Sequence, residues 1–330
     1  MSTPIVLEVE HTTTYRYHKP VEFSAHRVAC HPRAGHDIRV LHANLEVSPY
    51  SRQYWIHDVF SNSVAIVEPL IPADELRFTM RFAIEHYGVQ NDELPVAKEA
   101  EIYPFTYSPA VRDDLGGFLV AQYPEDATVV REWVTSFLPN RGRIHTRDVL
   151  VNMNEAIFTD FRYAARTAMG TQRPSQTLES RQGTCRDFAL LMMEAARSLG
   201  LAARFVSGYL YDPALDKMDP PADGRLVDAP NQTGVSSLDV GGTVGSGATH
   251  AWLHVFLPGA GWVPFDPTNK FLGGTDLIRS AFTRTPEQAA PVSGSWTGVA
   301  SDFIDMSVEV KVCRRAALQK QAPHAPLPNS

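Results

Sequence analysis

The strongest hydrophobic pattern in the chain lies between Cys185 and Gly200. Apolar side chains recur there at three- and four-residue spacing, and further apolar residues fill most of the remaining circumference, which predicts a helix that is buried almost all round. Thr184, followed three residues later by the acid Asp187, resembles a capping box, and Gly200 is a usual stop residue. The sequence therefore predicts a helix that begins at Cys185.

A different pattern fills residues 4 to about 88. Short runs rich in Val, Ile, Thr, Tyr and Phe are separated by Pro, Gly, Asn and Asp, and the runs at 42–47 and 76–84 alternate in period two. Such alternation with frequent breaks is typical of antiparallel strands. We expect an N-terminal antiparallel β-sandwich domain over residues 1–90.

The rest of the chain mixes helical and strand patterns, so the predicted fold class is α+β. We expect, in order, a polar linker at 91–120, helices around 127–138 and 146–161, a polar loop at 171–179 and a strand at 202–211. Residues 212–247 show no periodicity, and so long a loop is usually a lid, a binding loop or disordered. Alternation at 306–312 predicts a half-exposed strand. The second domain should span 121–314, and a flexible tail 315–330.

Composition narrows the class of protein. With 44% hydrophobic and 20% charged residues, the 330-residue chain is typical of globular proteins, and its net charge of −7 disfavours a nucleic-acid-binding surface. The N-terminus lacks the basic start and apolar core of a signal peptide, and no apolar run approaches the roughly 20 residues of a membrane helix. We therefore expect no nucleic-acid or membrane partner, and a cytoplasmic location.

Neither cysteine nor histidine spacing predicts a metal site. Cys30, Cys185 and Cys313 are an odd number at wide spacing, which suggests neither a disulfide framework nor a zinc cluster. Many of the 12 histidines lie in the N-terminal region: His11, His18, His26, His31, His36, His42 and His57. Their spacings match no ligand signature, so we expect structural or solvated histidines and no metal or other cofactor.

The position of Cys185 suits a nucleophile. A thiol in the first turn of a helix lies near unpaired backbone N–H groups and the positive end of the helix dipole, and both favour the thiolate. The helix alone also permits another interpretation, because a lone cysteine is commonly just a small buried residue. The choice depends on partners elsewhere in the chain.

Those partners are predicted in the stretch 249–268. Two β-prone runs flank a Pro-Gly-Ala-Gly segment at 258–261, which predicts a hairpin. With a turn centred near Pro258 and Gly259, His250 and Asp266 would be direct cross-strand partners, with Cβ atoms about 4.5 to 5.5 Å apart. A one-residue shift of register would instead place them on opposite faces.

Cys185, His250 and Asp266 would supply a nucleophile, a base and a group that orients the base. His254 is a rival base on the same face, roughly 13 Å along the strand, and the match with Asp266 favours His250. Taken without the helix, the hairpin fits an ordinary core with incidental polar residues equally well.

These motifs, in this order, closely resemble the bacterial transglutaminase-like proteins, many of which are named as cysteine proteases. The resemblance rests on residues 183–189, 203–210, 250–252 and 261–269, and on residues 11–17, 20–21 and 58–62 of the N-terminal β region. It covers nearly the whole chain. Thr184 stands where Val or Ile is usual, which is compatible with capping. Phe60-Ser61-Asn62 replaces the more usual Phe-Gly-Asn, and this change should touch only the N-terminal domain.

The resemblance implies a papain-like catalytic core over 121–314, with Cys185 as nucleophile, His250 as general base and acid, and Asp266 as the orienting carboxylate. Backbone N–H groups at the helix start would form part of the oxyanion site.

Three further residues are candidates for binding the substrate or its oxyanion. Gln182 is either an oxyanion donor or a polar loop residue. Trp252 and Trp262 either wall the cleft or belong to the core.

The predicted activity is acyl transfer from an amide bond of a protein or peptide through a thioester. Hydrolysis by a cysteine protease or amidase is favoured over transfer to a lysine amine, the crosslinking reaction of transglutaminases, and no Asp/Glu-rich calcium loop is evident. A third interpretation is a non-catalytic module that retains the triad while the 212–247 loop and the sandwich hold a partner protein. An intact triad argues against this last interpretation.

Overall fold

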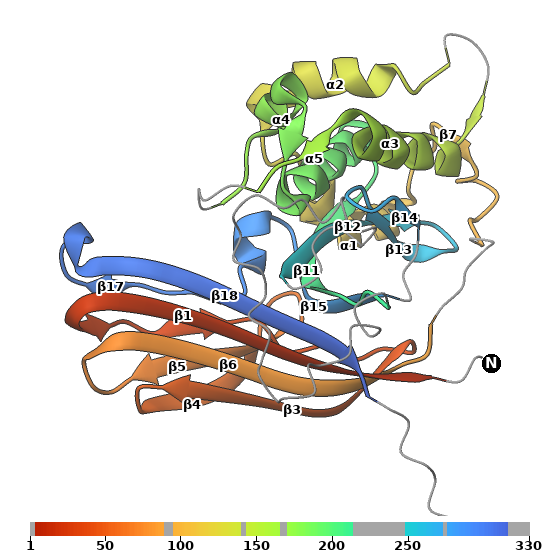
Figure 1. The fold of residues 1–330 in the computed structure, drawn as a ribbon. Helices are drawn as coiled ribbons and strands as arrows, with labels where there is room; N and C mark the ends of the chain where they lie inside the picture. Colours follow the sequence, from red (N-terminus) through yellow and green to blue (C-terminus); the bar gives the residue numbers. More distant parts are fainter. Residues whose placement is uncertain are drawn as a thin grey trace, which may run out of the picture.

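The computed structural model describes residues 4–88, 95–139, 143–165, 170–213, 248–272 and 276–315 (Figure 1). The predicted loop at 212–247 and the predicted tail at 315–330 lie almost entirely outside these residues. None of the helices in the described ranges is both long enough and apolar enough to cross a membrane. The cytoplasmic location stays a prediction.

The N-terminal region is a sandwich of two antiparallel sheets, as the alternating pattern predicted. In the first sheet, β1 (Ile5–Phe23) pairs with β6 (Ala73–His86), which pairs with β3 (Ile38–Ser48). The second sheet has the order β16-β2-β5-β4, over Val292–Ser293, His26–Val28, Ser63–Pro69 and Ser51–His57. Alternate residues of both sheets, among them Leu7, Phe82 and Val67, form one hydrophobic cluster.

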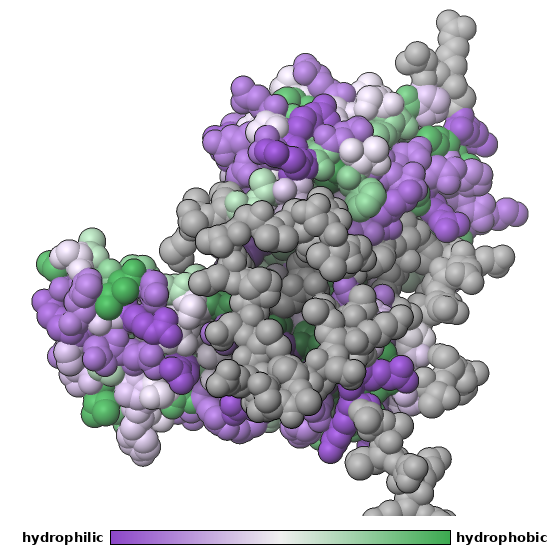
Figure 2. Space-filling view, viewed as in Figure 1, coloured by the Kyte–Doolittle hydropathy of each residue, from purple (hydrophilic) through white to green (hydrophobic). Residues whose placement is uncertain are grey.

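The outer edge of the first sheet comes from the opposite end of the chain. β18 (Phe303–Arg314) pairs antiparallel with β1, and the short β17 (Trp296–Thr297) pairs with the end of β1 (Figure 1). This strand is therefore hydrogen-bonded into the sandwich, although it lies in the range predicted for the second domain. Pairing between segments so far apart has no local sequence signal. Figure 2 shows hydrophobic side chains at the end of the sandwich where β17 lies in Figure 1. Phe303 and Ile304, at the start of β18, are exposed.

The second region packs helices against a sheet, which confirms the predicted α+β class. Five antiparallel strands run in the order β14-β13-β12-β11-β15, over Phe271–Leu272, Gly261–Asp266, Thr249–Leu257, Ala203–Leu210 and Leu277–Thr283. α5 (Cys185–Ser198) packs on β12 and β11, and three helices pack near it: α2 (Ala127–Thr135), α3 (Thr146–Asp160) and α4 (Pro174–Ser180) (Figure 1).

The predicted helix at 185–199 is confirmed in its start, its burial and its end. It begins at Cys185 and has 12 of its 14 residues buried. Gly200 follows with φ +78°, a conformation that glycine adopts without steric cost. The polar loop predicted at 171–179 is instead partly helical, because Pro174 occupies the first position of α4, where its missing N–H costs nothing.

The described part of the predicted linker is packed against the core. β7 (Ile102–Tyr103) pairs with β8 (Ile144–His145), and α1 (Pro109–Leu115) is followed by the 3-10 turn η1 (Gly116–Leu119). The Tyr107 hydroxyl donates to the carbonyl of Phe256 at 2.8 Å and accepts the N–H of Ala202 at 3.0 Å. Residues 95–120 therefore cover the sheet of the second region.

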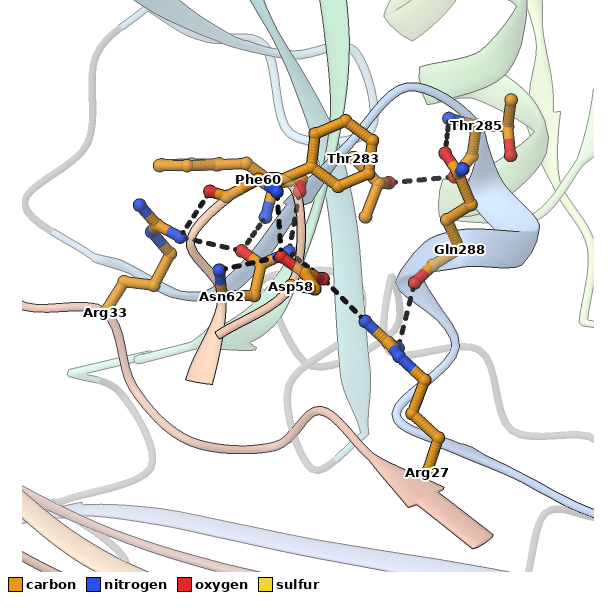
Figure 3. A network of polar contacts seen from close by, with 9 residues as sticks. Arg27, Arg33, Asp58, Phe60, Asn62, Thr283, Thr285 and Gln288 are labelled. Carbon is orange, nitrogen blue, oxygen red and sulfur yellow. Dashed lines mark hydrogen bonds and ion pairs between the residues drawn. The ribbon is translucent and has the colours of Figure 1, made fainter. Parts of the chain in front are cut away.

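The two regions are joined by a turn of the sandwich that lies against β15 (Figure 3). The Asn62 side chain donates from Nδ2 to the carbonyl of Phe282 at 2.8 Å and accepts the N–H of the same residue at 2.9 Å. The Asp58 carboxylate holds the turn by accepting from the backbone N–H groups of Phe60 and Asn62. The expectation that the Phe60-Ser61-Asn62 motif touches only the N-terminal domain is therefore wrong.

Further contacts extend this junction. Arg27 binds Asp58 at 2.7 Å and also donates to the carbonyl of Gln288 (Figure 3). Arg279 of β15 forms a bidentate pair with Asp37. Tyr209 and Ile278 of the second region belong to the same hydrophobic cluster as the sandwich core. The sheet of the second region is thus fixed on the sandwich by both polar and apolar contacts.

Candidate active site

The start of α5 places the Cys185 thiol. The Asp187 carboxylate accepts from the N–H of Thr184 at 2.8 Å, from the Thr184 hydroxyl at 2.9 Å and from the N–H of Gln172 at 2.6 Å. Gly183 is required by close packing, because a Cβ there would lie 2.8 Å from the Cβ of Asp187. The helix start is therefore fixed on both sides of Cys185, a residue that is 5% exposed.

The hairpin of β12 and β13 places the other two residues. Its observed register pairs Leu253 with Phe265 and Leu257 with Gly261, so the turn centres on Gly259, one residue beyond the predicted centre. Continued along the strands, this register makes His250 and Asp266 diagonal neighbours rather than direct partners. A shift of two in pairing keeps both on one face, and diagonal side chains are within reach when one is an aromatic ring.

His250 and Asp266 form a buried pair. Nε2 of His250 lies 2.8 Å from Oδ2 of Asp266, and both side chains are fully buried. Asp266 also accepts from the N–H groups of Thr268 and Asn269 and from Nδ2 of Asn269. Burial raises the pKa of Asp266, but the charge and hydrogen bond of His250, with these further donors, lower it below the ordinary value.

The imidazole connects this carboxylate to the thiol. Burial lowers the pKa of His250, but the charge and hydrogen bond of Asp266, with those of Cys185, raise it to about 10. Nδ1 is buried and makes no hydrogen bond of regular geometry within the described residues. Since Nε2 is held by Asp266, Nδ1 is the nitrogen left to exchange a proton with the thiol.

The thiol is biased towards its anion. Burial raises the pKa of Cys185, but the hydrogen bond and charge of His250, the charge of Arg186 and the backbone N–H of Ala251 together lower it below the ordinary value. Cys30 shows the opposite behaviour, because burial raises the pKa of its thiol to about 12. Of these two buried thiols, only Cys185 lies in surroundings that stabilise a thiolate.

The rival base, His254, lies in a different environment. Its Nδ1 is 3.1 Å from Nη2 of Arg204, and its Nε2 is 3.2 Å from Nε1 of Trp252. Burial, with the charges of Arg204 and Arg279, lowers the pKa of His254 well below its ordinary value. Both ring nitrogens therefore face donors, and neither is left to accept a proton from a thiol.

The remaining predicted residues are spread around the site. Trp252 is 1% exposed and stacks on His250 with ring centroids 5.9 Å apart, so it supports the imidazole from within the core instead of walling a cleft. The carbonyl oxygen of the Gln182 side chain accepts from Arg162 at 2.9 Å, which leaves the amide N–H groups of Gln182 as its donors. Trp262 packs against Arg204 at the other end of the hairpin.

Three residues near the site were not predicted. Asn269 gives Asp266 two of its hydrogen bonds, and the Asp-Pro-Thr-Asn order at 266–269 is the signal that could have found it, since Asp commonly accepts from backbone N–H groups shortly downstream. Arg186 donates to the Thr249 hydroxyl at 3.3 Å, beside His250. Burial, with the charge of Cys185, raises the pKa of Tyr163, so this phenol lies near the thiol.

No group of three or more His, Cys, Asp or Glu side chains in the described part of the chain is placed to hold a metal ion. Several N-terminal histidines have structural partners. His11 contacts the hydroxyl groups of Tyr209 and Thr13, and Nδ1 of His26 contacts the carbonyl of Ser24.

Comparison with known families identifies both regions. Residues 141–267 match the transglutaminase-like superfamily, and residues 7–85 match the bacterial transglutaminase-like N-terminal region. The predicted resemblance is confirmed, because the family models match a transglutaminase-like core and, before it, a bacterial transglutaminase-like N-terminal region.

Individual proteins are similar to this chain in fold or in sequence. A solved structure of a candidate cysteine protease from Cytophaga hutchinsonii has a TM-score of 0.63 and 17% identity, and the match covers 100% of this chain and 95% of that one. It shows that the fold is shared. An uncharacterised protein of Mycobacterium tuberculosis is 33% identical over 193 residues, 57% of this chain and 54% of its own length. An uncharacterised protein of Mycobacterium leprae is 25% identical over 92% of this chain and 98% of its own length. The match spans about half the length of the Mycobacterium tuberculosis relative.

Proposed function

We propose that the chain is a cysteine acyl-transfer enzyme that cleaves amide bonds of proteins or peptides through a thioester, with hydrolysis as the favoured outcome. The observation that carries the proposal is the fully buried imidazole of His250, which is hydrogen-bonded to Asp266 and lowers the pKa of a thiol at a helix start. The transglutaminase-like core and the shared fold of a candidate cysteine protease support it.

The reaction proceeds in two halves. The Cys185 thiolate attacks the amide carbon, and backbone N–H groups at the start of α5 would stabilise the oxyanion. The C–N bond breaks as the protonated His250 gives its proton to the leaving amine, which leaves a thioester on Cys185. Water then attacks the thioester carbon while His250 takes one of its protons, the C–S bond breaks, and the carboxylic acid leaves, which restores the Cys185 thiolate and the protonated His250. Asp266 holds the imidazole in one orientation throughout.

Transfer to an amine is the alternative second half. If a primary amine replaces water at the thioester, the product is a new amide, and a lysine side chain would give a crosslink. The chemistry at Cys185 is the same in both cases, so the acceptor decides the outcome.

A peptide mixture prepared from a cell extract tests the activity, followed by mass spectrometry with and without added cadaverine. We expect new peptide termini or deamidated glutamines with the wild-type protein, loss of both with Cys185→Ala, and retention with Cys313→Ala, which removes an exposed thiol. Cadaverine incorporated in place of water would assign the crosslinking reaction. Products that persist with Cys185→Ala would overturn the proposed nucleophile.

The reactivity of the thiol separates an enzyme from a binding module. Alkylation by iodoacetamide between pH 5 and 9, followed at each cysteine, should show Cys185 reacting well below the ordinary thiol pKa of about 8.5. Cys30 should stay inert. A Cys185 as slow as Cys30 would favour the non-catalytic binding module.

A further inference from the structure

A cavity lies at the junction of the sandwich and the core. Its volume is about 400 Å³, and it is bounded by the turn at 59–61, by α1 and η1, and by strands of the core sheet. Aromatic side chains make up much of its wall: Phe60, Phe118, Phe256, Trp262 and Phe282. The first four form a continuous series, because Phe118 contacts Phe60 and Trp262, and Trp262 contacts Phe256, with ring centroids 5.3 to 6.0 Å apart.

This wall carries a partly buried cation. The guanidinium of Arg204 lies 3.6 Å from the ring centroid of Phe282 and 4.2 Å from that of Trp262, and the side chain keeps a partial exposure at the cavity. Burial lowers the pKa of Arg204 to about 9, and the charges of Arg33 and Arg279 add to the effect. Within the described residues, Arg204 has no carboxylate at ion-pair distance, whereas Arg279 is neutralised by Asp37.

Arg204 is also short of hydrogen-bond acceptors. Its Nε is buried without a partner among the described residues. Its Nη2 faces Nδ1 of His254, but Trp252 directs its own N–H at the other ring nitrogen. A neutral imidazole has one lone pair, so it can accept from only one of these two donors. Among the described residues, a guanidinium with five N–H donors therefore has at most one protein acceptor, which is costly for a partly buried charge.

We propose that this cavity binds an organic monocarboxylate with an aromatic or aliphatic body. The planar guanidinium matches a carboxylate in shape and charge, and the aromatic wall would cover the apolar body. Asp114 lines the same cavity and is exposed, so its negative charge disfavours ions of higher charge such as phosphate.

The cavity is separate from the candidate active site. Arg204 contacts His254, which is four residues from His250 and so roughly 13 Å along β12. The inference rests on the cavity and its cation, and it does not depend on the proposed function.

Calorimetric titration of the full chain with 3-phenylpropionate tests it, with 3-phenylpropionamide as the neutral analogue. We expect one site at which the acid binds at least about tenfold more tightly than the amide. Arg204→Lys should weaken the acid about tenfold, because it keeps the charge but loses the planar fork. Arg147→Gln, which removes an exposed arginine elsewhere, should leave the affinity unchanged. Equal affinity for acid and amide would overturn the proposal.

A pair of neighbouring acids gives a test that does not disturb the core. Asp114→Asn removes the carboxylate that lines the cavity and should tighten binding of the acid about threefold, whereas Asp113→Asn, also exposed but not in the wall, should not. Alkylation of Cys185 should leave the affinity unchanged. Identical affinities for the two asparagine variants, or loss of binding on alkylation, would place the ligand elsewhere and contradict the proposal.

Discussion

At the scale of single residues, burial shifts the pKa of the buried thiols Cys30 and Cys185 and of the buried imidazoles His250 and His254, and neighbouring groups decide whether that shift is reversed. Burial raises the pKa of Cys30 to about 12, and burial with the charges of Arg204 and Arg279 lowers the pKa of His254 well below its ordinary value. At Cys185 and His250 the same burial is outweighed by mutual attraction and by Asp266. A thiolate–imidazolium pair is thus favoured where the proposed chemistry needs it.

His250→Gln should raise the pKa of Cys185, because it removes the hydrogen bond and the charge that lower it. In the wild type the alkylation rate should already be near its plateau below pH 8.5. In the variant the alkylation rate should still be rising at pH 9, because burial raises the pKa of the thiol and His250 no longer opposes it. The rate of Cys185 alkylation against pH checks this. His254→Gln is the control, and a rising profile in that variant instead would move the base to His254.

Ser61→Gly should stabilise the protein by about 1 kcal/mol, because Ser61 has a φ of +60°, a left-handed conformation that favours glycine. Ser63→Gly, two residues on in β5, should destabilise by about 0.5–1 kcal/mol, since glycine weakens a strand. Urea denaturation measures both. A change of the same sign in the unfolding free energy of both variants would contradict this explanation of the turn.

At the scale of elements, the start of α5 depends on one carboxylate. Asp187 occupies the third position of the helix and joins the Thr184 cap to the segment that contains Gln172. The same carboxylate packs against Gly183. The helix start and the loops on either side of it are therefore one unit, and the thiol lies within it.

Asp187→Ala should cost about 2 kcal/mol of unfolding free energy and slow the alkylation of Cys185, because the capping contacts that fix the helix start are lost. Asp148→Ala removes an exposed acid at the corresponding position of α3 and should cost less than about 0.5 kcal/mol. Chemical denaturation and thiol kinetics check the pair. Equal losses of unfolding free energy in the two variants would mean that Asp187 stabilises the helix only by placing a negative charge in its first turn.

At the scale of the whole molecule, the sandwich and the core are held together by paired polar groups as well as by apolar packing. Asn62 satisfies both backbone groups of Phe282, and Asp37 neutralises Arg279. β18 returns to the sandwich after the core is complete. We expect the two regions to unfold as one unit.

Asn62→Ala should reduce the unfolding free energy by about 3 kcal/mol, because it leaves the N–H and carbonyl of Phe282 buried and unpaired. Asn44→Ala, on an exposed strand position, should cost less than about 0.5 kcal/mol. Urea unfolding followed by tryptophan fluorescence measures both. A wild-type transition in two separate steps would contradict the single unit.

Short-range sequence features predicted much of the candidate site. The capping residues around Cys185 and the stop at Gly200 lie within a few residues of the helix that they define, so the sequence placed both ends of that helix. The hairpin was also predicted, but its register was not. The three residues between Leu257 and Gly261 form the turn, with Gly259 and Gly261 at positive φ, and residues 95–97 pack against it. No residue of the hairpin itself signals this packing, so the hairpin sequence could not predict the register.

The sequence by itself determined the two regions, the helix that begins with Cys185 and the histidine and acid that accompany it, because these depend on side-chain periodicity and on interactions within one or two turns. Only the tertiary structure decided that β18 completes the sandwich, that Asn62 binds the opposite region, and that Arg204 faces an aromatic cavity without a carboxylate at ion-pair distance among the described residues. Each of these contacts joins segments that are far apart in the chain, so the packing of the whole molecule selects them.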